Sequence, residues 1–169
     1  MKAAHARALA DYNRWMNERL YAVCDGISDL ERKRERRVFF RSIHGTLNHL
    51  LLGDKIWLGR FEGIPFPVDS LDQELFDDFK VLREERRVTD QRIEDWASGL
   101  TDRILDDNFR FTSIVDPAGR ECKLWVAVTH FFNHQTHHRG QLTALLSQVE
   151  CDYGVTDFIW LPGLVSKTD

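Results

Sequence analysis

Four long stretches of this 169-residue chain repeat their apolar residues at spacings of three and four. That spacing places the apolar residues on one face of a helix with 3.6 residues per turn, so each stretch is expected to form an amphipathic helix. The first ends near Gly26, the second runs from about Arg41 to Phe61, and the last spans about Lys123 to Val149. The series in the first stretch is Leu9, Tyr12, Met16, Leu20 and Val23.

The third stretch is expected to begin near Ser70, an N-cap residue with Gln73 three positions later. Its stripe is Leu75, Phe79, Leu82, Arg86, Thr89, Ile93, Trp96 and Leu100. After it, Phe109, Phe111 and Ile114 break the helical period and DPAG signals a turn, which predicts a short β-hairpin. The tail DFIWLPGL is expected to pack back on the domain as a short irregular segment.

Four helices with one hairpin-like insertion before the last predict an all-α four-helix bundle. The length suits one domain over residues 1–169, and the sequence contains no internal repeat and no convincing linker. Bundles of this kind often hold metal ions in the core between facing helices.

Composition excludes several other classes of protein. A net charge of −4 argues against general nucleic-acid binding, and the basic run ERKRERR (residues 31–37) is interpreted as a solvated loop, with an anionic partner as the alternative. No apolar run approaches the ~20 residues of a transmembrane helix, and the N-terminus lacks a signal-peptide core. We therefore expect no membrane partner and a cytoplasmic location, where Cys24, Cys122 and Cys151 would be reduced thiols.

Four of the seven histidines lie in HFFNHQTHHRGQ, residues 130–141. On a helical wheel, six apolar residues of the last helix lie within about 40° of His138, and His134 falls in the same arc. The six are Leu124, Ala127, Phe131, Leu142, Leu145 and Val149. His134 and His138 are therefore expected to point into the core, one turn apart. His130 and His137 lie at the shoulder of this face, where they could line the mouth of the same site. The far side is predicted to hold Thr129, Thr136, Arg139, Gly140, Thr143 and Ser147.

Two imidazoles among apolar residues cannot comfortably both be charged, because desolvation and like-charge repulsion oppose it. Two neutral rings one turn apart are a ready platform for a divalent metal. The alternative, hydrogen-bonded core histidines without a metal, stays open at this point.

A third ligand would have to come from another helix, and the second stretch contains His44 and His49. His49 lies on an apolar flank and His44 on the polar side, so periodicity favours His49. Asp54 could hydrogen-bond a ligand ring or form a salt bridge with Arg86. Arg86 itself could anchor a substrate carboxylate, although a structural ion pair is favoured because inward arginines need partners.

NHQTHHRGQL (residues 133–142), LNHLLLGDKIWLGRF (47–61) and ALADYNRWMNERLY (8–21) resemble the helix signatures of the DinB/YfiT-like four-helix metalloproteins. The resemblance covers nearly the whole chain in the right order. It implies an up-down-down-up bundle with a three-histidine site formed by His49, His134 and His138. It also implies a homodimer formed through outer helix faces, where Gly140 could permit close packing.

Three neutral histidines leave coordination positions open, as in catalytic metal sites. Such a set suits Zn²⁺ or Ni²⁺, with Fe²⁺ and Mn²⁺ as further options. Gln135 stands where zinc peptidases of the HExxH type have their glutamate, so peptidase activity is disfavoured. The last helix carries no Asp or Glu before Glu150, which disfavours a di-iron site.

Some relatives of this fold are thiol-dependent transferases or isomerases. The resemblance therefore suggests a metal-dependent thiol S-transferase whose partner is a small-molecule thiol. The rival hypothesis is a non-catalytic metal-binding or stress-response protein whose metal is structural or sensory. An interaction module that has lost its metal is a third alternative, weakened by the retention of all three histidines.

Overall fold

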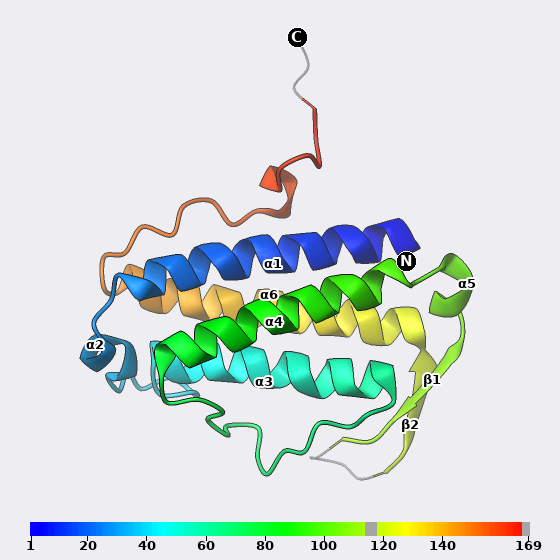
Figure 1. The fold of residues 1–169 in the computed structure, drawn as a ribbon, viewed down its shortest axis with the longest axis horizontal. Helices are drawn as coiled ribbons and strands as arrows, with labels where there is room; N and C mark the ends of the chain where they lie inside the picture. The colour runs from blue at the N-terminus through cyan, green and yellow to red at the C-terminus, as the bar shows by residue number, and fades with distance from the viewer. Residues whose placement is uncertain (114–117, 167–169) are drawn as a thin grey trace.

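The computed structural model describes residues 1–113 and 118–166, and its main elements are four long helices (Figure 1). Their bounds are α1 Ala3–Asp25, α3 Ile43–Glu62, α4 Phe79–Ser98 and α6 Leu124–Ser147. Helices α1 and α6 run in one direction and α3 and α4 in the other. Helix α1 packs chiefly against α4 and α3 chiefly against α6, with α3–α4 and α1–α6 contacts closing the bundle. The predicted all-α, up-down-down-up arrangement is therefore confirmed.

The shorter elements connect or follow these helices. They are α2 Asp29–Lys33, α5 Asp102–Leu105, β1 Asn108–Phe111, β2 Arg120–Lys123 and the 3₁₀ turn Phe158–Trp160. Strands β1 and β2 pair antiparallel, with Asn108 opposite Lys123 and Phe111 opposite Arg120. This pair confirms the hairpin predicted before the last helix, although Ile114 and part of the predicted DPAG turn lie outside the described residues.

The predicted start of the third helix at Ser70 is wrong. Helix α4 begins at Phe79, where the Asp78 carboxylate accepts the backbone N–H groups of Lys80 and Val81 at 2.8 and 3.0 Å. Because α3 and α4 are parallel, residues 63–78 must travel back along the bundle before α4 can begin (Figure 1). Leu75 of the predicted stripe therefore belongs to this crossover and not to a helix. The crossover is attached to α3 through the Asn48 side-chain oxygen, which accepts hydrogen bonds from the backbone N–H groups of Leu75 and Phe76 at 2.9 and 3.0 Å.

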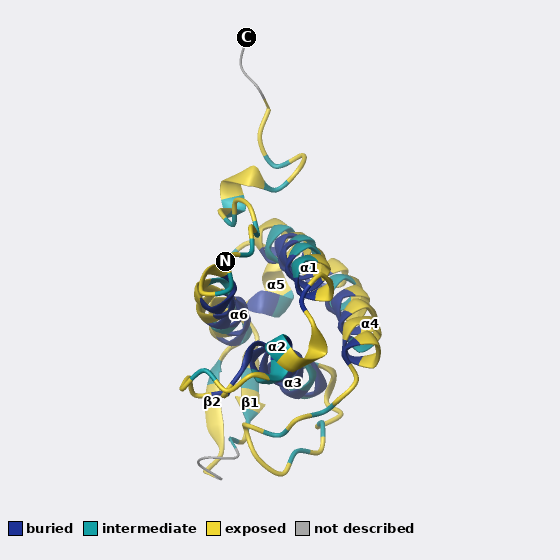
Figure 2. Ribbon diagram, turned by 90° about the vertical axis from the view of Figure 1, so that its left-hand side faces the viewer, coloured by how far each residue is buried: buried dark blue, intermediate teal, exposed yellow. Residues whose placement is uncertain are grey.

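The buried faces of the long helices turn toward the bundle axis (Figure 2). They form two apolar clusters, one around Leu47, Leu82 and Leu142 and the other around Leu58, Ile93 and Phe131. Such burial is the main favourable term in folding. A set of buried polar side chains also lies in the interior: Asn13, Asn17, Asp54, Arg86, Asp90, Gln135 and Arg139.

Arg86 is the centre of this polar set. Its guanidinium pairs with Asp54 at 2.6 Å and with Asp90 at 2.9 Å, and its side chain is only 2% exposed. The structural ion pair is thus the correct interpretation of Arg86, and Asp54 is its partner. The prediction that Arg139 lies on the far side is wrong, because α1 covers that part of α6 and Arg139 donates there to the buried Asn13 side chain.

The basic run 31–37 is only partly a solvated loop. Arg32 is buried, donates to the backbone carbonyls of Cys24 and Ile27, and lies 4.2 Å over the Phe79 ring. It thereby satisfies carbonyl groups at the C-terminus of α1, which a helix end leaves without partners. Arg34 and Arg37 are exposed, as expected.

The tail packs back on α1, as predicted. The Tyr12 hydroxyl donates to the Thr156 carbonyl, Phe158 meets the Tyr12 ring edge-on at 5.3 Å, and Arg19 donates to the Tyr153 carbonyl at 3.2 Å. Among the described residues, none of the helices is long and apolar enough to span a membrane.

Candidate metal centre

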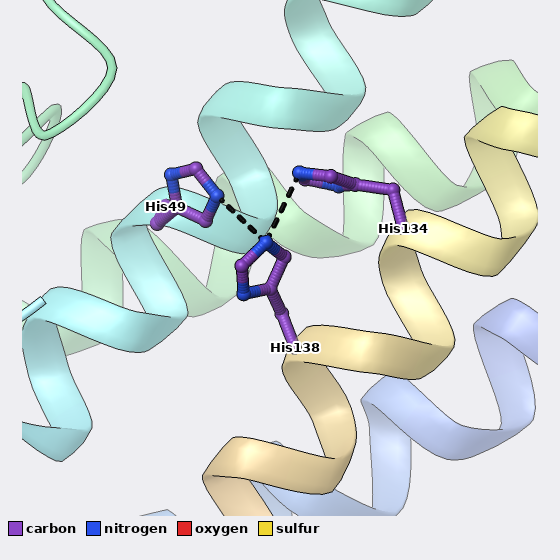
Figure 3. A group of neighbouring side chains, drawn as sticks. All are labelled: His49, His134 and His138. Carbon is purple, nitrogen blue, oxygen red and sulfur yellow. Dashed lines mark hydrogen bonds between the residues drawn. The ribbon is translucent and has the colours of Figure 1, made fainter. Parts of the chain in front are cut away.

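Three histidines from two helices converge between α3 and α6 (Figure 3). His49 comes from α3, and His134 and His138 come from successive turns of α6. The Nε2 atom of His138 lies 3.2 Å from that of His49 and 3.1 Å from that of His134. The structure therefore brings together the three residues that the sequence singled out, as a group able to hold a metal ion.

Hydrogen bonds define the protonation of two of these rings. His49 Nδ1 lies 2.9 Å from the Leu71 carbonyl, and His138 Nδ1 lies 2.8 Å from the Gln141 side-chain oxygen. Because these oxygens can only accept, each Nδ1 carries the proton and each Nε2 presents a lone pair. Two lone pairs facing each other at 3.2 Å repel unless a cation lies between them, so the donor set fits a metal.

The spacing of the nitrogens also fits. Metal–nitrogen bonds of 2.0–2.1 Å place ligand nitrogens about 3.3 Å apart around a tetrahedral ion and about 2.9 Å apart around an octahedral one. The separations of 3.1 and 3.2 Å lie between these values. His134 Nδ1 is buried and has no hydrogen-bond partner in the described part of the chain.

Burial keeps the cluster neutral. Desolvation lowers the pKa of His49 to about 4 and, together with the neighbouring histidines, that of His134 to about 3. It also lowers the pKa of His138. Neutral imidazole is the form that binds metals, so at pH 7 no proton has to leave before a metal ion binds.

Two glycines and one aromatic side chain shape this pocket. A Cβ atom at Gly53 would lie 2.9 Å from His134 Cε1, so the glycine of NHLLLGD lets this ring lie against α3. Phe40, in the loop before α3, stacks on His49 with ring centroids 3.7 Å apart and meets His138 edge-on at 5.3 Å. A Cβ atom at Gly45 would overlap the Phe40 carbonyl, so this glycine too is required. Sequence reasoning missed Phe40, because nothing in the helical pattern marks a loop residue as a wall of the site.

His130 and His137 contact the triad without belonging to it, with ring centroids 6.0 Å from His134 and 4.8 Å from His138, respectively. His130 and His137 are exposed, as expected of shoulder residues. His130 lines a cavity with His49 and His134, and its ring centroid is 4.8 Å from that of Trp57.

The prediction that His44 faces the polar side is wrong. It is 1% exposed because the crossover covers that side of α3, and its Nε2 donates to the Phe76 carbonyl at 2.8 Å. The same Nε2 lies 3.3 Å from a Glu74 carboxylate oxygen. Because Nε2 carries the proton donated to Phe76, it has no lone pair for a metal, and we interpret His44 as a structural residue.

Among the described residues, no carboxylate hydrogen-bonds the triad rings in the way proposed for Asp54. Asp54 instead accepts from Gln135 and pairs with Arg86, while Leu71 and Gln141 orient the ligand rings. Gln135 points into the core, toward Asp54 and the Leu50 carbonyl. Among the described residues that line the cavity at the triad, none is acidic, so no carboxylate base is in place there.

A helical bundle with three converging imidazoles defines the class of this protein, and comparison with known proteins identifies the family. The profile of the DinB family matches residues 1–162, and the chain belongs to that family. The protein DinB of Bacillus subtilis (strain 168) is 27% identical over 158 residues, which cover 89% of each chain. The crystal structure of a DinB-like protein from Bacillus cereus ATCC 10987 has the same fold, with a TM-score of 0.61 at 20% identity over 83% of this chain and 89% of the other.

Proposed function

We propose that this protein binds one divalent metal ion through the Nε2 atoms of His49, His134 and His138 and uses it to activate a small-molecule thiol. The observation that carries the proposal is the convergence of neutral nitrogens at 3.1 and 3.2 Å, two of them with lone pairs directed at each other. Zn²⁺ and Ni²⁺ suit this donor set best, and Fe²⁺ and Mn²⁺ also accept imidazole ligands.

The chemistry proposed is S-transfer. A metal held by His49, His134 and His138 would lower the pKa of a coordinated thiol, which would lose its proton to solvent. The thiolate sulfur would then form a bond to an electrophilic carbon, and the leaving group would depart with the electron pair of the bond that breaks. The protein supplies a water-poor wall through Phe40 and a cavity of about 190 Å³ beside His49 and His134 for the reactants.

Metal content tests the first half of the proposal. Protein purified without a histidine tag should contain about one metal ion per chain by elemental analysis, and the His49→Ala variant should contain much less. His5→Ala, the same change at an exposed histidine on α1, is the control and should keep the metal. Equal metal content in His49→Ala and the control would remove His49 as a ligand.

Activity tests the second half. Metal-loaded protein is incubated with a low-molecular-weight thiol and an electrophile, and conjugation is compared with that of His134→Ala. If the two proteins conjugate at the same rate, the transferase proposal fails.

The rival function is a non-catalytic metal-binding or stress-response protein. It predicts a large fall in melting temperature on chelation and no turnover with any substrate, whereas a catalytic site predicts loss of turnover with a small change in melting. The hydrogen bonds from His49 to Leu71 and from His138 to Gln141 hold these two rings in place without a metal. They therefore favour a site that is organised before the metal binds.

A homodimer formed through outer helix faces is a further part of the proposal. Light scattering coupled to size-exclusion chromatography measures it directly: a mass near 40 kDa, about twice the 19.8 kDa of the chain, supports the dimer.

A further inference from the structure

A cavity leads away from the histidine cluster along one face of α3. It has a volume of about 190 Å³, and α3 residues at successive turns line it: His49, Leu52, Gly53, Ile56, Trp57 and Arg60. His130 and His134 of α6 form the opposite wall. Arg60 and Ile56 also line an adjacent outer cavity of about 520 Å³. Arg60 therefore lies where the inner cavity meets the outer one.

Arg60 is a half-buried cation without a counter-ion in the described part of the chain. Its guanidinium carbon lies 4.6 Å from the centroid of the Trp57 ring and 5.6 Å from that of Phe111. Burial lowers its pKa, and no carboxylate among the described residues opposes that effect. The described residues that line the two cavities include no Asp or Glu. Other cations near this end of the bundle are paired, as Lys55 is with Glu85 and Arg110 is with Glu121.

The guanidinium lies over the Trp57 and Phe111 rings. The N–H groups of an arginine point outward in the plane of its guanidinium, where that edge can meet an acceptor. A carboxylate matches that edge with two parallel hydrogen bonds, and such charge-assisted pairs are among the strongest in proteins.

The distance between Arg60 and the cluster limits the length of a ligand that reaches both. Eleven residues separate His49 from Arg60, which is about 16 Å of rise and leaves the two about 20° apart around the helix. The side chains of His49 and Arg60 both lean toward the N-terminus of α3, so the lean leaves their separation nearly unchanged. His134 lies beside Gly53, seven residues or about 10 Å of rise before Arg60, so the guanidinium lies about 10–16 Å from the triad. The wall between them is largely apolar, with Leu52, Ile56 and Trp57.

We propose that Arg60 binds the carboxylate of a small organic acid whose apolar chain lies along α3 and whose other end reaches the three-histidine cluster. The contact of the acid with the histidine cluster rests on the proposed function of that cluster. The contact of the carboxylate with Arg60 does not. The proposal gives the substrate pocket a chemical class: an acid with a chain of about six carbons, the carboxyl carbon included, whose far end carries the group at the metal.

The first experiment needs no metal. Hexanoate and hexanol are titrated into chelator-treated protein, and the indole signal of Trp57 is followed by NMR. Wild-type protein should bind hexanoate about tenfold more tightly than hexanol, and Arg60→Gln should reduce the preference to less than twofold. Arg110→Gln, which removes a paired arginine at the outer cavity, should keep it. Equal binding of the two compounds to wild-type protein, or an undiminished preference in Arg60→Gln, would overturn the proposal.

The second experiment separates this inference from the function of the cluster. Zinc-loaded protein is titrated with 6-mercaptohexanoate and 6-mercaptohexanol by calorimetry. If neither thiol binds more tightly than its counterpart without sulfur, the proposed thiol activation fails while the Arg60 site stands. If 6-mercaptohexanoate is not preferred over 6-mercaptohexanol, the Arg60 site fails. Far-UV circular dichroism checks that Arg60→Gln folds, and Arg60→Lys, which keeps the charge but not the two-pronged edge, should retain only part of the preference.

Discussion

The buried ion pair between Asp54 and Arg86 allows a quantitative test of how this core is held together. Asp54 is 0% exposed and Arg86 2%, and their closest atoms are 2.6 Å apart. Replacing Asp54 with Leu leaves Arg86 charged, buried and dependent on Asp90 at 2.9 Å. Removing one partner of a buried pair costs 3–5 kcal/mol, and the remaining contact to Asp90 places the expected loss near the lower value, about 3 kcal/mol.

That loss converts to a change in melting temperature. Unfolding entropy is about 2.1 cal/mol/K per residue, or roughly 0.35 kcal/mol/K for this 169-residue chain. The melting temperature of Asp54→Leu should therefore fall by about 8 °C in calorimetry, and urea unfolding should show the same loss of free energy. The measurement belongs at pH 7, because burial raises the pKa of Asp54 to about 6 and the carboxylate is ionised above that value.

An exposed pair on α4 is the matched control. Glu84 and Arg87 lie 2.7 Å apart, but their side chains are 61% and 60% exposed. Glu84→Ala should cost less than 1 kcal/mol, because exposed ion pairs contribute little. In addition, Asp54→Leu combined with Arg86→Met should cost less than the sum of the two single changes, since the loss of the Asp54–Arg86 pair is then counted once, although Asp90 loses Arg86 in both Arg86 variants. A loss below 1 kcal/mol in Asp54→Leu would refute the reasoning.

Three further predictions concern the histidine cluster. In metal-free protein, the free energy of unfolding should rise as the pH increases from about 4 to 6.5, because the unfolded chain binds protons on His49 and His134 that the folded state, with pKa values of about 4 and about 3, excludes. The raised pKa of Asp54, about 6, opposes this rise below pH 6, but the combined shift of the two histidines is larger; urea titrations at pH 5 and 7 check this, and equal stability would contradict it. Phe40→Ala exposes the His49 ring and should raise the pKa of His49 toward 6.5, measured by NMR titration of the ring protons; an unchanged pKa would show that Phe40 does not desolvate the ring. Gly53→Ala should weaken metal affinity at least tenfold by calorimetry, since its Cβ would lie 2.9 Å from His134. The control Gly140→Ala, whose Cβ would have nothing within 4 Å, should leave affinity unchanged and add about 1 kcal/mol of helix stability. Equal affinities in the two variants would contradict the steric argument.

The sequence by itself determined the helices and which residues share a face of each. Period and turn signals were enough for four helices, the hairpin and the packing of the tail, because amphipathicity is a property of a local stretch of chain. The His134–His138 pair follows from the same rule, since residues four apart lie on one side of a helix. The choice of His49 as their companion relied more on family resemblance than on periodicity.

The tertiary structure decided what covers each face. Periodicity predicts polar sides for His44 and Arg139, yet the crossover buries His44 and α1 buries Arg139. Helix α4 begins at Phe79 and not at the predicted Ser70, because a connection between parallel helices must first travel the length of the bundle. Periodicity cannot show this, because it describes one helix and contains no information about its neighbours.

The same limit applies to the surroundings of the histidine cluster. The stacking of Phe40 on His49 and the position of Arg60 at the end of the cavity depend on segments that meet only in the folded bundle. The local pattern of the chain selected His134 and His138 of the last helix. The packing of α3 against α6 determined that the His49 ring meets them and how far Arg60 lies from all three.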